Sequence, residues 1–373
     1  MFTKILNACK AAFRREAVLF IAAACAVLSM FFVPPDGEYL SYIDLRVLCL
    51  LFCLMTVVAG FQQCGLFHLL AQKLLSGKKQ FRLLSLILVL LPFFSSMVIT
   101  NDVALITFVP FTILVMEMIG EERRLIYLIV LQTAAANLGS MATPVGNPQN
   151  LYLYGRYSLS PGNFFAAMGP LTLLSLIGLC AAASAVKSDA IEVSFARQEH
   201  IRKPSILLLM TGLFVLCLLS VFRLLPYWAL LIVVVAALLI FDRELFLRAD
   251  YGLLLTFICF FVFAGNMGRI GPVRDFLDGM LRQSAVLTSA LTSQIISNVP
   301  AAVLLSGFTE NGRGLLIGTN IGGLGTLIAS LASLISFKFY IRTPKAKPFK
   351  YLTVFTLVNG AGLLLLLGAA AFI

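Results

Sequence analysis

Long runs of apolar residues alternate with short polar segments along the whole chain. A helix needs about 20 apolar residues to cross a bilayer, and most of the runs are close to this length. The pattern therefore predicts an all-α polytopic membrane protein with about ten transmembrane helices. The runs lie at 17–33, 44–66, 83–118, 125–150, 163–186, 205–222, 226–241, 251–268, 284–308, 314–337 and 351–372.

The composition agrees with a membrane protein. Hydrophobic residues make up 60% of the chain and charged residues 12%, whereas a soluble domain has about 25% charged residues. The mean hydropathy is +0.98. The two histidines are far apart in sequence and the cysteines form no C-x-x-C pair, so we expect no metal centre, no cofactor and no enzyme active site.

The basic residues predict the topology. A net charge of +11 would suggest a nucleic-acid partner in a soluble protein, but membrane proteins collect Lys and Arg on the cytoplasmic side. We expect a bacterial inner (plasma) membrane protein in contact with lipid, with a cytoplasmic N-terminus and no nucleic-acid partner. Its cytoplasmic segments, which contain every lysine, are then 1–16, 73–82, 119–124, 187–204, 242–250 and 338–350.

This topology requires two apolar runs to enter and leave the membrane on the same face. Run 83–118 has basic residues at both ends, and run 284–308 must have both ends outside if 338–350 is cytoplasmic. Both runs are predicted to be re-entrant hairpins. The polar heptads S-S-M-V-I-T-N (95–101) and T-S-Q-I-I-S-N (292–298) would form their tips.

The two halves of the chain repeat each other. N-L-G-S-M-A-T at 137–143 matches N-I-G-G-L-G-T at 320–326, each after a hairpin. A single connecting span would invert the second copy, which gives the inverted-topology repeat of many secondary transporters. The predicted divisions are 1–186 for the first repeat, 187–225 for a cytoplasmic linker and connecting span, and 226–373 for the second repeat.

Helix-breaking residues follow both hairpins. Pro144, Gly146 and Pro148 lie within one short stretch and predict an interrupted helix. Irregular backbone at membrane depth occurs where it lines a cavity or is buried in protein. We therefore expect two hairpin tips and two broken helices to form a small polar chamber.

The candidate substrate or ion ligands come from these four segments. They are the tip residues Thr100, Asn101, Asp102, Ser297 and Asn298, and the broken-helix residues Asn137, Thr143, Gly146, Asn147, Asn320, Gly322 and Thr326. Ser, Thr and Asn at the tips are alternatively caps of the half-helices.

Asp102 has no acidic counterpart in the second tip, where Val299 takes its position. An acidic residue within a membrane segment suggests proton or Na⁺ binding, and its alternative role is an N-terminal cap. No Lys or Arg is expected in the chamber. An anion would then be held by helix N-termini, hydroxyls, amides and a bound cation such as Na⁺ at the tips.

At these motifs the sequence resembles the ion transporter superfamily, which includes divalent anion:sodium symporters, citrate transporters, arsenite permeases and bacterial sodium/proton antiporters. The resemblance rests on T-N-D (100–102), S-N-V-P (297–300), A-T-P-V-G-N-P-Q-N (142–150) and G-T-N-I-G-G-L-G-T (318–326). It implies a scaffold domain, a moving transport domain, an elevator-like mechanism and often a homodimer. Asp102 and Val299 depart from the Ser-Asn-Thr tips of the anion symporters, and the Asn-Asp pair is similar to the arsenite permease and antiporter branches.

The expected function is secondary active transport of a small anion coupled to Na⁺ or H⁺. The alternative is a cation/proton antiporter or an arsenite-type efflux permease that uses Asp102. A passive channel would not need matched broken helices. An enzyme is disfavoured because the chain has neither metal-ligand spacing nor a G-x-S-x-G motif.

Overall fold

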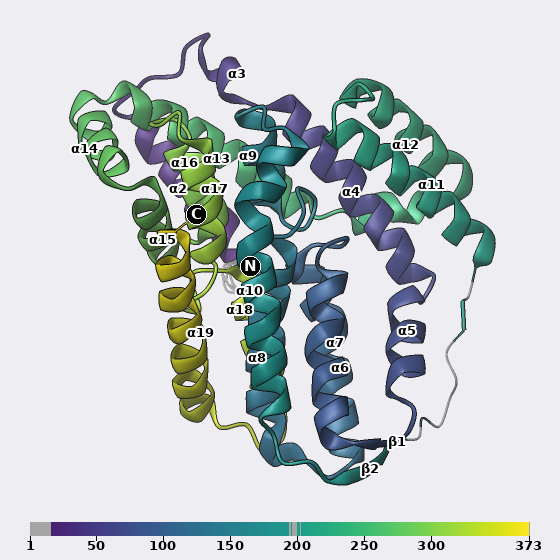
Figure 1. The fold of residues 1–373 in the computed structure, drawn as a ribbon. Helices are drawn as coiled ribbons and strands as arrows, with labels where there is room; N and C mark the ends of the chain where they lie inside the picture. Colours follow the sequence, from purple (N-terminus) through teal and green to yellow (C-terminus); the bar gives the residue numbers. More distant parts are fainter. Residues whose placement is uncertain (1–15, 194, 196–199, 202, 373) are drawn as a thin grey trace, which may run out of the picture.

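The computed structural model describes residues 16–193, 195, 200–201 and 203–372 (Figure 1). The basic segment at 1–16, on which the cytoplasmic N-terminus depends, lies almost wholly outside this part. The elements outside the two hairpins and the two interrupted helices are α2 (Ala17–Met30), α3 (Tyr39–Tyr42), α4 (Leu45–Gln63), α5 (Leu66–Leu75), β1 (Gly77–Gln80), η1 (Glu122–Arg124), α10 (Pro161–Ser184), β2 (Ala190–Val193), α11 (Pro204–Val221), α12 (Tyr227–Phe241), η2 (Arg243–Arg248), α13 (Tyr251–Arg269), α14 (Gly271–Gln283) and α19 (Pro348–Ala370).

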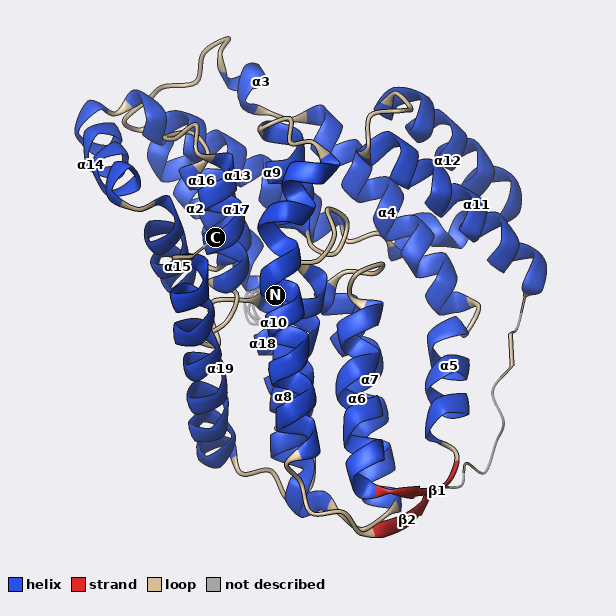
Figure 2. Ribbon diagram, in the orientation of Figure 1, coloured by secondary structure: helices blue, strands red, loops and turns tan. Residues whose placement is uncertain are grey.

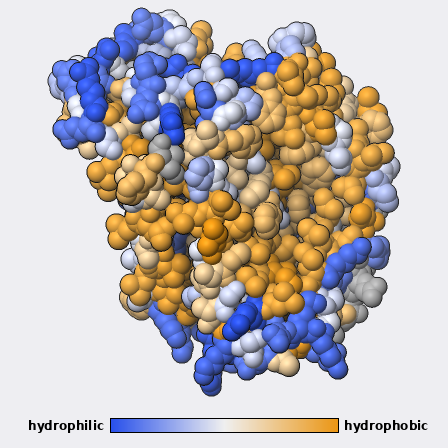
Figure 3. All heavy atoms as spheres, viewed as in Figure 1, coloured by the Kyte–Doolittle hydropathy of each residue, from blue (hydrophilic) through white to orange (hydrophobic). Residues whose placement is uncertain are grey.

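Apolar side chains cover the middle of the molecule. In the described part of the chain, six helices are long and apolar enough to cross a membrane, and shorter apolar helices accompany them. Figure 3 shows an apolar belt between two polar ends. On α12, Ile232 and Ile240 are 62% and 74% exposed, as expected for a surface that faces lipid. The chain is a polytopic integral membrane protein.

Each of the two predicted hairpin runs forms two helices joined at the polar heptad. The first consists of α6 (Phe81–Ser95) and α7 (Asn101–Met118), and the second of α15 (Ala285–Ile296) and α16 (Asn298–Leu305). The break in the second hairpin is a single residue, Ser297, whose φ of 75° lies in the left-handed region. Such a backbone conformation costs about 1–3 kcal/mol and persists where its surroundings enforce it.

The two predicted broken helices are also interrupted. Helix α8 (Leu125–Ser140) is followed after a seven-residue turn by α9 (Pro148–Arg156), and the two lie one above the other in Figure 1. Helix α17 (Gly312–Ile321) is followed by α18 (Leu331–Tyr340). Pro148 stands at the first position of α9, where its missing N–H leaves no hydrogen bond unmade.

Hairpins and interrupted helices pack in a reciprocal pattern. The first arm of each hairpin packs on the first half of the interrupted helix that follows it, α6 on α8 and α15 on α17. The second arm packs on the far half of the other interrupted helix, α7 on α18 and α16 on α9. The two halves of the chain are therefore interlocked around the four breaks.

Two features at the ends of the molecule were not predicted. Strands β1 and β2 pair antiparallel, with Gly77 opposite Val193, and join two segments that we expect on the cytoplasmic side (Figure 2). The expectation of a purely helical chain was wrong here, because short polar segments that meet outside the apolar belt satisfy their backbone groups by pairing. An ion pair of 2.8 Å between Arg124 and Asp189 adjoins β2.

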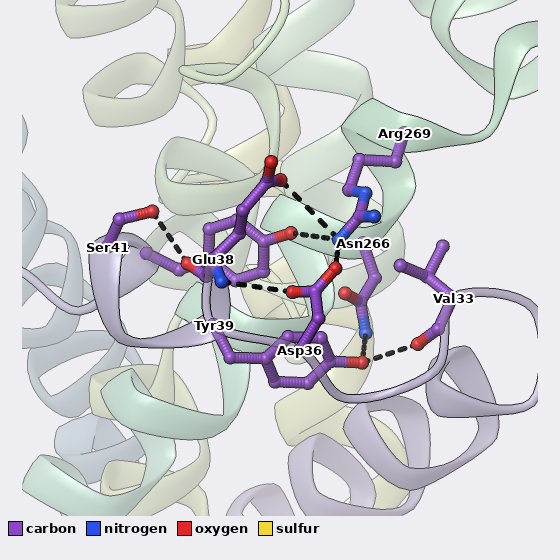
Figure 4. Close-up of polar contacts among 8 residues, drawn as sticks. Val33, Asp36, Glu38, Tyr39, Ser41, Asn266 and Arg269 are labelled. Carbon is purple, nitrogen blue, oxygen red and sulfur yellow. Dashed lines mark hydrogen bonds and ion pairs between the residues drawn. The ribbon is translucent and has the colours of Figure 1, made fainter.

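At the opposite end, a polar cluster fastens the loop between α2 and α4 to α13 (Figure 4). Arg269 contacts the Asp36 carboxylate at 2.7 Å and the Tyr42 hydroxyl at 3.2 Å. The side-chain amide of Asn266 donates to Ser29 Oγ at 2.9 Å and to Tyr39 Oη at 2.8 Å. These bonds fix α13 against α2, and α13 leads into the wall of the candidate site.

Glycine permits close packing at both interrupted helices. A Cβ built on Gly139 would overlap the Phe93 carbonyl oxygen and approach Ser96 Oγ to 2.7 Å. One built on Gly322 would approach Ser293 Oγ to 2.8 Å. Ser96 and Ser293 occupy the same position in their heptads. The same glycine–serine approach therefore occurs in both halves.

Gly139→Ala is expected to lower the free energy of unfolding by about 1–3 kcal/mol, because the added methyl group must displace the backbone of Phe93. The measurement is the unfolding temperature of the purified variant in detergent. Gly178→Ala is the matched control, because nothing lies within 4 Å of a Cβ at this exposed position of α10. Equal unfolding temperatures for the two variants would contradict the close approach.

Candidate functional site

One buried amide, Asn137 at the end of α8, joins three of the four breaks. Its Oδ1 accepts hydrogen bonds from Asn101 Nδ2 at 2.9 Å and from Ser330 Oγ at 3.0 Å. Its Nδ2 donates to the carbonyl of Gly323 at 3.3 Å. The amide thus connects the first hairpin tip with the interruption between α17 and α18.

Asn320 has the corresponding role in the second half. Its Oδ1 accepts from Asn147 Nδ2 at 3.1 Å, and its Nδ2 donates to Asn150 Oδ1 and to the Leu316 carbonyl. In the aligned motifs Asn320 corresponds to Asn137, and Ser330 corresponds to Asn147. Each half therefore donates one hydrogen bond to the buried asparagine of the other.

Both threonines of the N-x-G-x-x-small-T motif bind a hairpin backbone. Thr143 Oγ1 donates to the Met97 carbonyl at 2.6 Å, and Thr326 Oγ1 donates to the Gln294 carbonyl at 3.1 Å. Met97 and Gln294 are the same position of the two heptads. These bonds attach each hairpin to its interrupted helix at an equivalent point.

Gln294 satisfies the backbone of the second interruption. Its Nε2 donates to the carbonyls of Gly322 and Leu324 at 2.9 and 3.0 Å, and its Oε1 accepts from the Thr326 N–H at 2.9 Å. An unpaired carbonyl in hydrocarbon would cost several kcal/mol. In the first interruption, Asn150 Nδ2 binds the Thr143 carbonyl at 3.1 Å, while Gly146 allows the tight turn against the Ser140 carbonyl.

The hydroxyls at the two tips do not cap the helices that follow them. Thr100 and Ser297 stand at the N-cap positions of α7 and α16, and neither side chain makes a capping hydrogen bond. Ser297 Oγ donates instead to the Ala329 carbonyl at 3.3 Å, and the Asn298 N–H donates to the same carbonyl at 2.9 Å. The capping interpretation of these two hydroxyls is therefore wrong.

A cavity of about 160 Å³ lies beside the first tip, and we call it the central cavity. The N-terminal ends of four helices reach it, through Thr100 and Asp102 of α7, Asn147 and Pro148 of α9, Asp250 of α13, and Leu331 of α18. Helix N-termini carry partial positive charge. The remaining wall comes mainly from apolar residues of α4 and α7, with Gln62 as a further polar group.

Only part of the predicted site lines this cavity. Thr100, Asp102 and Asn147 do so, whereas the second tip and its threonine belong to the hydrogen-bonded network around the interruptions. Asn101 and Asn137 lie behind the lining residues, joined to each other. The prediction that the four segments meet is confirmed by these contacts, but the two tips differ in their access to the cavity.

Asp102 lies at the cavity wall with one carboxylate oxygen unsatisfied. Its Oδ1 is buried and makes no hydrogen bond with any residue that the structure describes. Its backbone N–H donates to Asn101 Oδ1 at 3.0 Å. A buried carboxylate without a partner is strongly unfavourable in its charged form, so this position favours a bound proton or cation.

Sequence reasoning missed two charged residues of the cavity. Arg248 and Asp250, at the junction of η2 and α13, both line it. The expectation of a chamber free of Lys and Arg was therefore wrong. Arg248 belongs to the basic loop 242–250, and only the tertiary packing brings this loop beside the first tip.

The sequence matches the citrate transporter family over residues 2–310. It is 32% identical over 325 residues to the uncharacterized transporter MJ0456 of Methanocaldococcus jannaschii, covering 86% of this chain and 88% of that protein. Inner membrane protein YbiR of Escherichia coli is 32% identical over 315 residues and 83% of each chain.

The chain is also similar over a shorter length to the silicon efflux transporter LSI3 of rice. The two are 32% identical over 155 residues, which is 40% of this chain and 31% of that protein. The family match covers both hairpins and the first interrupted helix, and the two long alignments extend over most of the chain. The chain, with its interlocked hairpins and interrupted helices, is thus a membrane transporter of the citrate transporter family.

Proposed function

We propose that this protein is a secondary active transporter that moves a small anion, a carboxylate or an oxyanion, in a cycle coupled to Na⁺ or H⁺. The observation that carries the proposal is the central cavity, which is lined by the first turns of α7, α9, α13 and α18. Aligned N-termini stabilise a negative charge without a permanent countercharge. The name of the family refers to citrate, which is a small carboxylate anion.

The proposal includes an inverted repeat, with repeats at 1–186 and 226–373 joined by 187–225. The paired bonds of Thr143 and Thr326 to equivalent hairpin carbonyls support it. So do the reciprocal bonds from Asn147 to Asn320 and from Ser330 to Asn137. Two unrelated halves would have no reason to share these contacts.

A second cavity, of about 410 Å³, is lined in part by residues that would match lining residues of the first in the proposed repeat. Ala59-Gly60 in the first half matches Ala264-Gly265 in the second, and Ile106 and Val303 each stand five residues after a matched heptad. Ala59 and Ile106 line the central cavity, whereas Ala264 and Val303 line the second. Tyr152 and Ile335 each stand nine residues after the threonine of their motif, and Ile335 lines the central cavity while Tyr152 lines the second. In alternating access one site opens to each membrane face in turn, and cavities lined by matching residues of two inverted repeats would suit such a cycle.

Asp102 would link the cargo to the coupling ion. An anion beside a charged, unpaired carboxylate is repelled strongly because the interior screens charges weakly. A proton or Na⁺ on Asp102 removes this repulsion. The cation would then bind first, and the anion would bind well only when the cation is present.

A second candidate is a cation/proton antiporter or an arsenite-type efflux permease with Asp102 as the exchanging group. The unsatisfied Oδ1 of Asp102 favours it, since that atom can bind a cation whether or not an anion follows. The two candidates differ in which species stabilises the folded protein.

The test is the unfolding temperature of the purified protein against citrate, succinate, phosphate and arsenite, each with Na⁺ or choline, over a range of pH. A ligand at about 100 times its Kd stabilises the folded state by about 2.7 kcal/mol. Stabilisation by citrate, succinate or phosphate that requires Na⁺ or low pH supports the anion transporter, whereas stabilisation by arsenite alone supports the arsenite-type permease. Stabilisation by Na⁺ or by a change of pH, with no further stabilisation by any of the anions, would replace the anion transporter with the antiporter.

Asn101→Ala and Asn298→Ala are each expected to abolish uptake of the stabilising anion into proteoliposomes while membrane insertion is retained. Each asparagine begins the second arm of a hairpin, and Asn101 holds the tip to Asn137. Insertion is checked by the amount of monodisperse protein purified from membranes. Uptake at the wild-type rate in either variant would remove that tip from the site.

Asp102→Asn is expected to change the cation dependence of transport more than the stability of the fold. The neutral amide retains the shape but cannot bind a proton or Na⁺ electrostatically. We expect the apparent affinity for the coupling cation to fall about tenfold or more, equivalent to about 1.4 kcal/mol. The measurement is uptake as a function of Na⁺ concentration and pH. A variant with unchanged dependence and a lower unfolding temperature would assign Asp102 a structural role alone.

A further inference from the structure

Two charged residues of the central cavity lie on one short segment outside both hairpins. Arg248 ends η2 and Asp250 precedes α13, and both are exposed. The Asp102 Oδ1 atom that lines the same cavity is buried. The segment therefore forms the solvent-facing part of the lining, and Asp102 forms a deep part.

The two side chains are engaged differently. Asp250 Oδ1 accepts a hydrogen bond from the Leu253 N–H at 2.9 Å and so caps α13. Arg248 makes no ion pair or hydrogen bond within the part of the chain that the structure describes. Its guanidinium is free to bind a solute, and it is the cationic group of the cavity lining.

We propose that Arg248 is the charge-selecting residue of the transport pathway, which draws an anionic cargo to the mouth of the central cavity. The proposal rests on the proposed function and extends it to a residue outside the repeat motifs. The planar guanidinium matches a carboxylate or phosphate group through two parallel hydrogen bonds. A charge at the rim of a binding site changes association rate and salt dependence more than the strength of the final complex.

Asp250 limits this attraction. The lining contains the carboxylates Asp102 and Asp250 against the single guanidinium of Arg248. With Asp102 neutralised by the coupling cation, Arg248 and Asp250 balance each other. An anion can then approach Arg248 and also leave, as transport requires. Removal of the Asp250 charge would strengthen anion binding.

The experiment is titration of the purified protein in detergent with citrate at one fixed Na⁺ concentration, followed by the unfolding temperature at low and at high choline chloride, with succinate and phosphate as further probes. Arg248→Gln is expected to weaken the apparent Kd for citrate about three- to fivefold at low salt, the size of an exposed charge contact. The difference shrinks at high salt because mobile ions screen exposed charges. Arg248→Lys restores part of the affinity.

Two variants control for structural effects. Arg243→Gln removes an exposed arginine from the same 3-10 helix, outside the cavity lining, and is expected to leave citrate binding unchanged. Asp250→Asn keeps a side-chain oxygen that can cap α13, because Asn caps helices as well as Asp does, and is expected to tighten citrate binding.

A wild-type Kd in Arg248→Gln, or an equal loss at both salt concentrations, would overturn the role of Arg248 and leave the proposed function standing. If the wild-type protein binds none of the three anions, the proposed function fails and the inference fails with it. A loss of the same size in Arg243→Gln would assign the effect to general surface charge and also overturn the inference.

Discussion

The structure depends on one constraint, that every backbone polar group within the apolar belt must find a partner. Two helices of this chain are interrupted inside that belt, and each interruption exposes carbonyl and N–H groups. Gln294 binds three of them with one side chain, and Asn137 and Asn150 bind others. The hairpins lie where their side chains can form hydrogen bonds with the backbone groups of the interrupted helices. The need to pair these backbone groups therefore determines how the rest of the chain packs.

The same bonds interlock the two halves of the chain. Asn147 donates to Asn320 and Ser330 donates to Asn137, so neither interrupted helix is complete without the other half. A hydrogen bond between membrane helices contributes about 0.6 kcal/mol on average, which is modest for one bond and appreciable for a connected set. The polar network thus pairs the backbone groups of the interrupted helices and also holds the residues that line the cavity in place.

The cavity combines this support with unevenly distributed charge. Helix N-termini provide diffuse positive potential, and Asp102 adds a carboxylate that only one half carries. In the second half the equivalent position is Val299, which packs against the core. The matched motifs therefore occur in both halves, and the difference at this position places a titratable group at one tip only. Membership of the citrate transporter family agrees with a polar cavity inside a membrane protein.

Much of the architecture was accessible from the sequence alone. The lengths of the apolar runs predicted the long helices closely, for example 251–268 against Tyr251–Arg269, because a membrane helix must cover its backbone with a continuous apolar surface. The polar heptads and the paired N-x-G-x-x-small-T motifs located the hairpin breaks and the interrupted helices. Polar clusters and prolines inside an apolar run are costly in a continuous membrane helix, so they mark the places where the helix ends.

Tertiary structure alone decided which of these residues reach a cavity. Thr100 lines it and Ser297 does not, although the two occupy the same position in matched heptads. Arg248 lies far from both motifs in sequence, and this loop and the first tip come together where α4, α7 and α13 line one cavity. Local patterns specify where a helix must break, because the backbone penalty is local. The lining of a cavity depends on which surfaces remain uncovered after packing, and that is a property of the whole fold.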